Sequence, residues 1–160
     1  MRIQQVDSLA GIARVHALRW QVFVDEQGVL PAEELDGRDE LDSSVHLIAV
    51  DDDGLDVGTA RLLTDDDEPG VVRVTRVAVL QRVRGQGVGR LLMAELERIA
   101  YAEHAIDGRV RVELSAQETA LPFYAALGYR IGTERYLDAR MWHRDAVKVL
   151  TAPPAAPTPH

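Results

Sequence analysis

The chain has no cysteine among its 160 residues. It therefore contains no disulfide, no zinc–thiolate site and no thiol nucleophile. Long apolar runs are missing too, since none approaches the roughly 20 residues that a membrane-spanning helix needs. The N-terminus lacks the basic segment and apolar core of a secretory signal. We therefore expect a cytoplasmic protein without a membrane partner.

Metal ligands and excess positive charge are also scarce. None of the five histidines is followed by another at i+4, the spacing that places two imidazoles on one helix face, so we expect no metal site. The 26 acidic residues outnumber the 18 basic ones, which gives a formal net charge of −8. Such a charge disfavours binding to nucleic acid. We expect no nucleic-acid partner.

What the chain does have is enough apolar material for a core. A hydrophobic content of 46% in 160 residues is typical of one folded domain, whereas two domains would be cramped. We assign this single domain to residues 1–150. Residues 151–160 form a tail rich in proline and alanine, which we expect to be mobile because it can bury little apolar surface.

Hydrophobic periodicity and turn residues predict strands and helices in the order β-α-β-β-β-α-β-α-β-β. The predicted strands are 1–6, 45–50, 55–63, 71–79, 109–114, 129–135 and 140–149. The predicted helices end near Val24, Ala102 and Leu127, and Asp7 and Thr119 are the expected N-caps of the first and third. Residues 28–42 read as a loop with room for a short helical turn. This order predicts an α+β (α/β) fold, with a mostly antiparallel central sheet and helices on both faces.

A glycine-rich stretch, RVAVLQRVRGQGVGRLL, joins a predicted strand to a predicted helix. It lies in a window, Pro69 to Ala94, that contains five arginines and no acidic residue. Glycines at 85, 87 and 89 let the backbone approach a ligand and adopt positive φ. The first amides of the following helix have no intrahelical acceptor, and the helix dipole makes that end partly positive. The stretch therefore predicts a site for a phosphate-bearing ligand.

Three phosphate-binding patterns can be compared with this stretch. A dinucleotide fold needs Gly-x-Gly-x-x-Gly and parallel strands, but here Gly89 comes one residue early and the predicted order is rich in hairpins. A P-loop ends in Gly-Lys-Ser/Thr, which Gly89-Arg90-Leu91 does not match. The pattern that remains is Arg84-x-x-Gly87-x-Gly89.

That pattern resembles the pyrophosphate-binding motif of the GNAT acetyltransferase superfamily. The segment LSAQETALPFYAALGYR, from Leu114 to Arg130, resembles the later strand–helix segment of the same family. The stretch LRWQVFVDEQ, from Leu18 to Gln27, together with ELDGRDELD and His46, is similar to the ElaA-like branch. The resemblance covers everything but the tail. It implies a GNAT-like sheet whose strands splay apart where coenzyme A binds.

The resemblance also implies which residues hold acetyl-CoA. The main chain of Val77, Ala78 and Val79 would pair with the pantetheine arm as an added strand does. Gln117 stands where many members have an asparagine that contacts the cofactor arm, and Tyr124 would lie beside the sulfur and protonate the departing thiolate. The pyrophosphate would be held by the segment Arg84, Gly85, Gln86, Gly87, Val88, Gly89 and Arg90.

The general base is less determined. An amine with a pKa near 10 is mostly protonated at pH 7, so a carboxylate or histidine must remove a proton. Our first candidates are His46 and Glu26; Asp36, Asp39 and His143 are the others. Arg76 is expected either to bind an anionic group of the substrate or to pair with an acidic residue. Arg19 is expected to form a buried ion pair, for example with Glu26.

Taken together, these residues predict an acetyl-CoA-dependent N-acetyltransferase. It would transfer the acetyl group by direct attack to a primary amine of a small molecule or a protein. Two alternatives stay open: an acyltransferase like the acyl-homoserine-lactone synthases, or a non-catalytic acyl-CoA-binding module. The exposed C-terminal hairpin makes a homodimer a further expectation.

Overall fold

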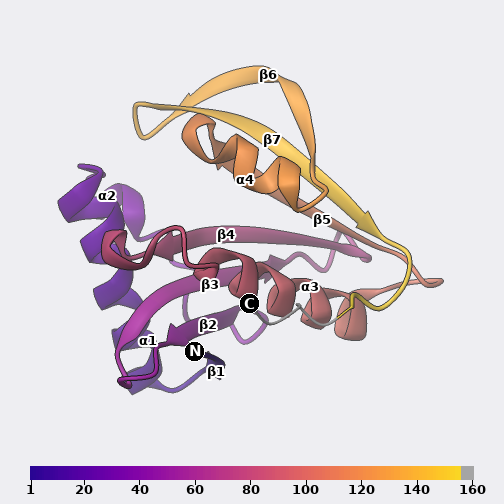
Figure 1. Ribbon diagram of the computed structural model, residues 1–160. Coiled ribbons are helices and arrows are strands. Elements are labelled where there is room, and N and C mark those ends of the chain that lie inside the picture. Colours follow the sequence, from indigo (N-terminus) through magenta and orange to yellow (C-terminus); the bar gives the residue numbers. More distant parts are fainter. Residues whose placement is uncertain (156–160) are drawn as a thin grey trace.

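The computed structural model describes residues 1–155, which form one seven-stranded sheet in the order β1-β2-β3-β4-β5-β7-β6 (Figure 1). The strands are β1 (Arg2–Val6), β2 (Val45–Val50), β3 (Asp56–Thr64), β4 (Val71–Val79), β5 (Val110–Gln117), β6 (Arg130–Asp138) and β7 (Met141–Leu150). The helices are α1 (Leu9–Arg19), α2 (Pro31–Glu34), α3 (Val88–His104) and α4 (Leu121–Ala126), with the π-helical η1 (Trp20–Glu26) and the 3-10 turns η2 (Gln81–Val83) and η3 (Glu118–Ala120). The predicted order of elements is confirmed.

Five of the six strand pairings are antiparallel, so the predicted mostly antiparallel sheet is also confirmed. The exception is β4, which pairs in parallel with β5 only from Val71 to Val74. Beyond that point β5 turns away with β7, as Figure 1 shows. The predicted splay between two central strands is therefore present.

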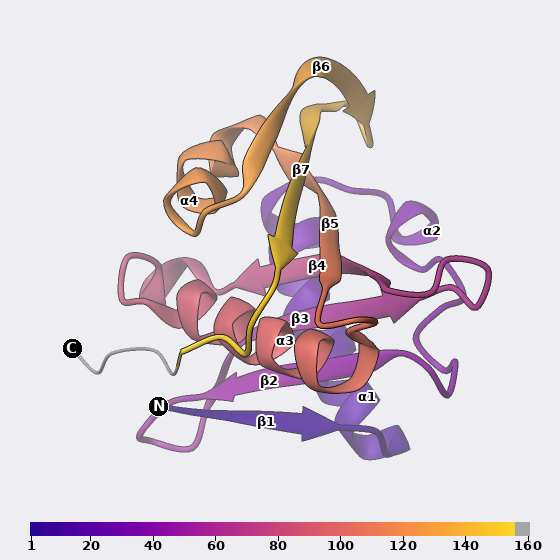
Figure 2. The same ribbon diagram turned by 90° about the vertical axis from the view of Figure 1, so that its right-hand side faces the viewer.

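Helices cover both faces of the sheet (Figure 2), and β2 shows how the sequence achieves this. Val45, Leu47 and Ala49 belong to the large apolar cluster under α3, whereas Ile48 and Val50 pack with α1. Alternate side chains of a strand point to opposite faces, so a strand covered on both sides must be apolar throughout. All six residues of β2 are accordingly buried.

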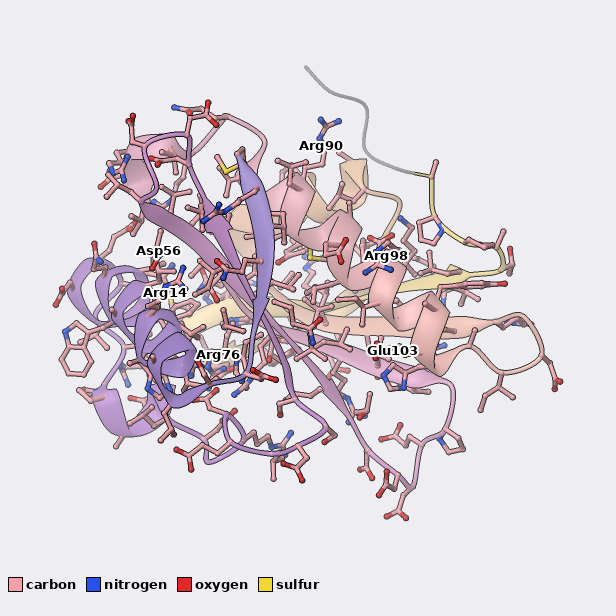
Figure 3. All side chains as sticks on the ribbon, turned by 90° about the horizontal axis from the view of Figure 1, so that it is seen from below. Arg14, Asp56, Arg76, Arg90, Arg98 and Glu103 are labelled. Atoms are coloured by element: carbon pink, nitrogen blue, oxygen red, sulfur yellow. The ribbon has the colours of Figure 1, made fainter. Side chains whose placement is uncertain are left out.

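The first helix differs from the prediction at both ends. Its N-cap is Ser8 rather than Asp7, because the Ser8 side chain accepts a hydrogen bond from the Gly11 amide at 3.0 Å. Leu9, the first residue of the helix, is 81% exposed. After Arg19 the helix widens into η1, a π-helix that periodicity alone does not reveal. In Figure 3, Arg14 of α1 points toward Asp56 of β3, and their ion pair of 2.8 Å links helix to sheet.

The C-terminal half follows the predicted order with shifted boundaries. Thr119 does not cap α4; it lies inside η3, and α4 has no side-chain cap. Gly128 ends this helix with a positive φ of 93°, as expected of a C-terminal glycine. In the part of the chain that the structure describes, no helix is long and apolar enough to cross a membrane. The tail predicted to be mobile lies outside the described residues from 156 onward.

Candidate active site

A cavity of about 300 Å³ opens where β4 and β5 diverge. Its walls come from η1 and the residues after it, α2, the unpaired parts of β4 and β5, α4, and the β6–β7 turn. Elements from both halves of the chain therefore meet here. A cavity at a break in the strand pairing offers unpaired main-chain groups along its side, which is where an extended ligand can bind.

The predicted cofactor strand forms one wall of this cavity. Val77 lines it directly. Ala78 and Val79 pair with Thr59 and Gly58 of β3 on the other edge, while within residues 1–155 β4 has no strand partner on its β5 side beyond Val74. The β4 edge at Val77 is therefore open to an extended chain. The Val79 carbonyl, in contrast, is engaged, because it accepts a hydrogen bond from Arg84 Nε at 3.0 Å.

The glycines after β4 serve two different purposes. Gly85 and Gly87 have φ values of 81° and 84°, which only glycine adopts without strain. Gly87 is the N-cap of α3, and its carbonyl accepts from the Leu91 amide at 3.1 Å. The amides just before Leu91 therefore have no intrahelical acceptor. Gly89 instead allows close packing, since a Cβ there would lie 3.1 Å from the Phe123 ring of α4.

The arginine of this turn is engaged with η1. Arg84 donates to both carboxylate oxygens of Glu26, at 2.5 and 2.6 Å. This hydrogen bonding lowers the pKa of Glu26, which weakens it as a base. Gln86 is exposed in the same turn, and Figure 3 shows Arg90 on the first turn of α3. The turn and the π-helix are therefore joined by a two-point contact.

Tyr124 and Gln117 both line the cavity. Tyr124 is only 7% exposed, and burial raises its pKa to about 12, so its hydroxyl is protonated at neutral pH and can donate. Edge contacts with Phe123 and Tyr129 hold the Tyr124 ring. Gln117 donates to Gln27 Oε1 at 2.9 Å. Gln27 is a cavity residue that we did not single out from the sequence.

The two first candidates for the general base lie elsewhere. His46 is 1% exposed in β2, does not line the cavity, and donates from Nε2 to the Asp39 carbonyl at 2.9 Å. Burial lowers the pKa of His46. Glu26 lies outside the cavity as well, beside Arg84. The roles of both residues stay predictions, but the structure does not bring them to Tyr124.

A buried network of charges lies beside the cavity. The Arg19 guanidinium is fully buried and pairs with Glu34 at 2.5 Å and Asp39 at 2.6 Å. The expected buried ion pair is therefore present, but its suggested partner, Glu26, was wrong. Arg61 pairs with Asp36 at 2.6 Å and with Asp39 at 2.9 Å. These contacts fasten α2 and the loop after it to α1 and β3.

Arg76 links this network to the cavity that it lines. It has a φ of 55° at an irregularity in the β3–β4 pairing, which aims its side chain at α2. Arg76 donates to the Glu34 carbonyl at 3.0 Å and lies 3.3 Å from the Glu34 carboxylate. Of the two roles expected for Arg76, the structure shows the pairing with acidic residues.

The two aspartates of the network are held ionised. Burial disfavours the charge on Asp36, but hydrogen bonds from Arg61 outweigh it and lower the pKa of Asp36 to about 2. The pKa of Asp39 is also well below its ordinary value, because hydrogen bonds from Arg19 and His16 outweigh its burial. Both carboxylates therefore stay charged at neutral pH and serve as arginine partners.

The cavity itself is acidic. Glu33, Glu34 and Asp138 line it together with a single arginine, Arg76. Glu33 is paired with Arg140 of the β6–β7 turn at 2.9 Å. The contribution of this turn, with Asp138, Ala139 and Met141, was missed because the hairpin is distant in sequence from the other walls. Within residues 1–155 no group of three His, Cys, Asp or Glu side chains could hold a metal ion.

Comparison with known proteins agrees with this geometry. The family model described as "Acetyltransferase (GNAT) domain" matches residues 42–131. YjcF of Bacillus subtilis strain 168, named an uncharacterized N-acetyltransferase, is 37% identical over 132 residues, covering 82% of this chain and 87% of that protein. Protein ElaA of Escherichia coli K12 is 37% identical over 120 residues, covering 74% of each chain.

Solved structures show the same architecture. The crystal structure of Escherichia coli ElaA has a TM-score of 0.79 at 28% identity and covers 92% of this chain and 98% of its own. The acyl-homoserine lactone synthase BjaI has a TM-score of 0.69 at 18% identity, covering 91% of this chain and 81% of its own. At that identity the similarity to BjaI shows the fold alone. The similarity to ElaA supports the branch to which the N-terminal sequence pointed.

Proposed function

Because this chain belongs to the GNAT acetyltransferase family, we propose that it is an acetyl-CoA-dependent N-acetyltransferase that acylates a primary amine by direct attack. One observation carries the proposal: the free edge of β4 at Val77 and the Tyr124 side chain line one cavity. Direct attack needs no enzyme nucleophile, so a chain without cysteine can perform it.

The cofactor half of the site provides binding and a proton. The amides from Arg84 to Arg90 would bind the diphosphate, since two positive-φ glycines and a helix N-terminus lie together there. The β4 edge at Val77–Val79 would bind the pantetheine arm through main-chain hydrogen bonds. Gln117 would contact the same arm from β5. Tyr124 would donate its proton to the thiolate sulfur as the thioester bond breaks.

The acceptor half favours a cationic substrate. Glu33, Glu34 and Asp138 line the cavity. Glu33 pairs with Arg140, and Glu34 pairs with the two arginines Arg19 and Arg76. Among residues 1–155 this leaves Asp138 as the lining carboxylate without an arginine partner, and such a charge on the wall of a partly enclosed cavity attracts a cation and repels an anion. An ammonium group carried by a polyamine, an aminosugar or a lysine side chain fits this requirement.

A panel of amines with acetyl-CoA, read by release of free thiol, tests the proposal. We expect turnover with cationic primary amines and background rates with amines that also carry a carboxylate. Thiol release that depends on S-adenosylmethionine and an acyl donor would instead support the synthase-like alternative. Calorimetric binding of coenzyme A without turnover on any amine would support the non-catalytic module. Gel filtration with light scattering tests the homodimer, and the cytoplasmic location stays a prediction.

A further inference from the structure

His143 is a cavity residue that the proposed function leaves unused. It lies on β7 and is 6% exposed. Its strand partners are Gln117 on β5 and Tyr136 on β6. Directly opposite residues of neighbouring strands project from the same face of a sheet, so His143 and Gln117 share the face that the cavity occupies. His143 therefore lies beside the residue proposed to contact the cofactor arm.

The protonation pattern of the His143 ring is set by one contact. Nδ1 lies 2.8 Å from the Met141 carbonyl oxygen. A carbonyl oxygen only accepts, so Nδ1 carries the proton in the neutral ring and Nε2 carries the lone pair. A histidine held in this tautomer has a basic nitrogen ready on the other side of its ring.

A second contact restrains the orientation of the ring. Tyr136 stacks on His143 with 6.0 Å between ring centroids and 19° between ring planes. The Tyr136 hydroxyl donates to Asp145 Oδ1 at 2.6 Å and also contacts the Ser115 hydroxyl, which fixes the tyrosine in turn.

The groups that face the same cavity as His143 or pack on its ring include both signs of charge. They are Glu33, Glu34, Arg76, Tyr124, Tyr136 and Asp138.

We propose that His143 Nε2 is the general base that deprotonates the acceptor amine, an inference that rests on the acetyltransferase function proposed above. Nε2 takes one proton from the substrate ammonium and later releases it to solvent. The nitrogen of the substrate amine, which is now neutral, then bonds to the thioester carbonyl carbon, and the carbon–sulfur bond breaks. Tyr124 protonates the sulfur, while the second nitrogen proton leaves through water and restores the tyrosine hydroxyl. One proton is released per turnover.

The other candidates are engaged in contacts that oppose this role. Glu26 is bound to Arg84 through both of its oxygens, and His46 uses Nε2 to donate to the Asp39 carbonyl. Asp36 and Asp39 are partners of buried arginines. Among these groups only His143 both lines the cavity and keeps a lone pair on a nitrogen that no backbone contact occupies.

His143→Asn removes the proposed base but can keep the hydrogen bond to the Met141 carbonyl. The shorter amide can still donate to the Met141 carbonyl, as Nδ1 does, but it has no group in place of Nε2. The rates are measured at pH 7 with a series of acceptor amines whose pKa values run from about 6 to about 10. Only about one in a thousand molecules of the most basic amine is neutral at that pH, so those acceptors need a base, whereas the weakly basic ones are already neutral.

We expect His143→Asn to lower kcat/KM about 100-fold for the most basic acceptors and less than about 3-fold for the weakest, with unchanged calorimetric affinity for coenzyme A. His104→Asn, at the end of α3, is the matched control and should behave as the wild type. An equal loss across the whole series would make His143 structural and overturn the proposal. Undiminished activity with basic amines would also overturn it, whereas an inactive wild type would overturn the proposed function itself.

Discussion

The two faces of the sheet are held together by different forces. Under α3, a continuous apolar cluster includes Leu92, Leu96 and Ala100, all with no exposed surface. On the α1 side the apolar cluster is small, and the largest fully buried side chains are two arginines, Arg19 and Arg61. The hydrophobic effect does not depend on the orientation of the buried groups, whereas ion pairs fix specific atoms at specific distances. In the proposed site, the half that would bind the cofactor thus depends on shape, and the half that would bind the acceptor depends on charge.

This difference explains what each half needs from the chain. The glycine turn and the β4 edge would bind the cofactor through the main chain, so their side chains need only leave room for it. The wall of the proposed acceptor half includes the loop of residues 28–42, which buries little apolar surface, since Leu30, Leu35 and Leu41 are exposed. Its position therefore depends on Glu34, Asp36 and Asp39 reaching the buried arginines.

Replacing Arg61 should give the largest effect on stability. Arg61→Met removes one partner from the buried Asp39 and another from the more exposed Asp36, and we expect a loss of about 3–5 kcal/mol in the free energy of unfolding, measured by urea denaturation. Arg14→Gln, which breaks a half-exposed pair with Asp56, should cost less than about 1 kcal/mol. If both variants lower the free energy of unfolding by less than about 1 kcal/mol, the α1 side of the sheet does not depend on its buried ion pairs.

Gly87→Val tests the half that depends on shape. A β-branched residue at a φ of 84° is strained, and its side chain would add bulk to the turn that we propose to hold the diphosphate. We expect at least a 100-fold loss of calorimetric affinity for coenzyme A. Gly70→Val carries a similar strain at a φ of 79° in the turn before β4, and it should keep that affinity. If both variants lose affinity for coenzyme A, the effect of Gly87→Val is due to backbone strain rather than to obstruction of the glycine turn.

Tyr124→Phe probes the point where the two halves meet. Without the Tyr124 hydroxyl, the departing thiolate of coenzyme A has no side chain to protonate it. We therefore expect kcat to fall about 100-fold while the affinity for coenzyme A stays unchanged. Tyr101→Phe on α3 is the control. Full activity of Tyr124→Phe would remove this residue from the reaction, and an equal loss of affinity would make it a binding group.

Acid should reduce the stability that the ion pairs on the α1 side of the sheet contribute. The pKa of Asp36 is about 2 in the folded chain, below its ordinary value of 3.8. A depressed folded pKa stabilises the fold above pH 4, and this contribution is lost as the pH falls through about 2. Urea denaturation across this range should show a shallower pH dependence for Asp36→Asn than for the wild type. Asp66→Asn, in the exposed β3–β4 turn, should leave the slope unchanged.

Local signals in the sequence were enough to predict the strands, the helices and the glycine turn between β4 and α3. The bounds of β2 and β4 match their predicted ranges, because alternating β-branched residues and flanking turns are local features. The N-caps were less certain, since Asp7 and Ser8 are both good capping residues and only the geometry selects Ser8. The change from α1 to η1 has no local periodic signal at all.

The acceptor half was less accessible to sequence reasoning. Arg19 could be expected to pair with some acid, but several acids follow it, and the choice of Glu34 and Asp39 over Glu26 depends on how the loop folds back. Gln27 and Asp138 carry no motif that would single them out. His143 was one of five possible bases, and its place in the cavity and its contacts with Met141 and Tyr136 distinguish it from the others.

The sequence by itself determined the order of strands and helices, the family and the glycine turn, since each of these is encoded by residues close together in the chain. Only the tertiary structure decided which acid meets which arginine, where the cavity lies and which side chains share it. Those contacts join residues that are tens of positions apart, from α1 to the loop before β2 and from α2 to the β6–β7 turn. Their geometry follows from how the whole sheet is packed, and no local pattern records it.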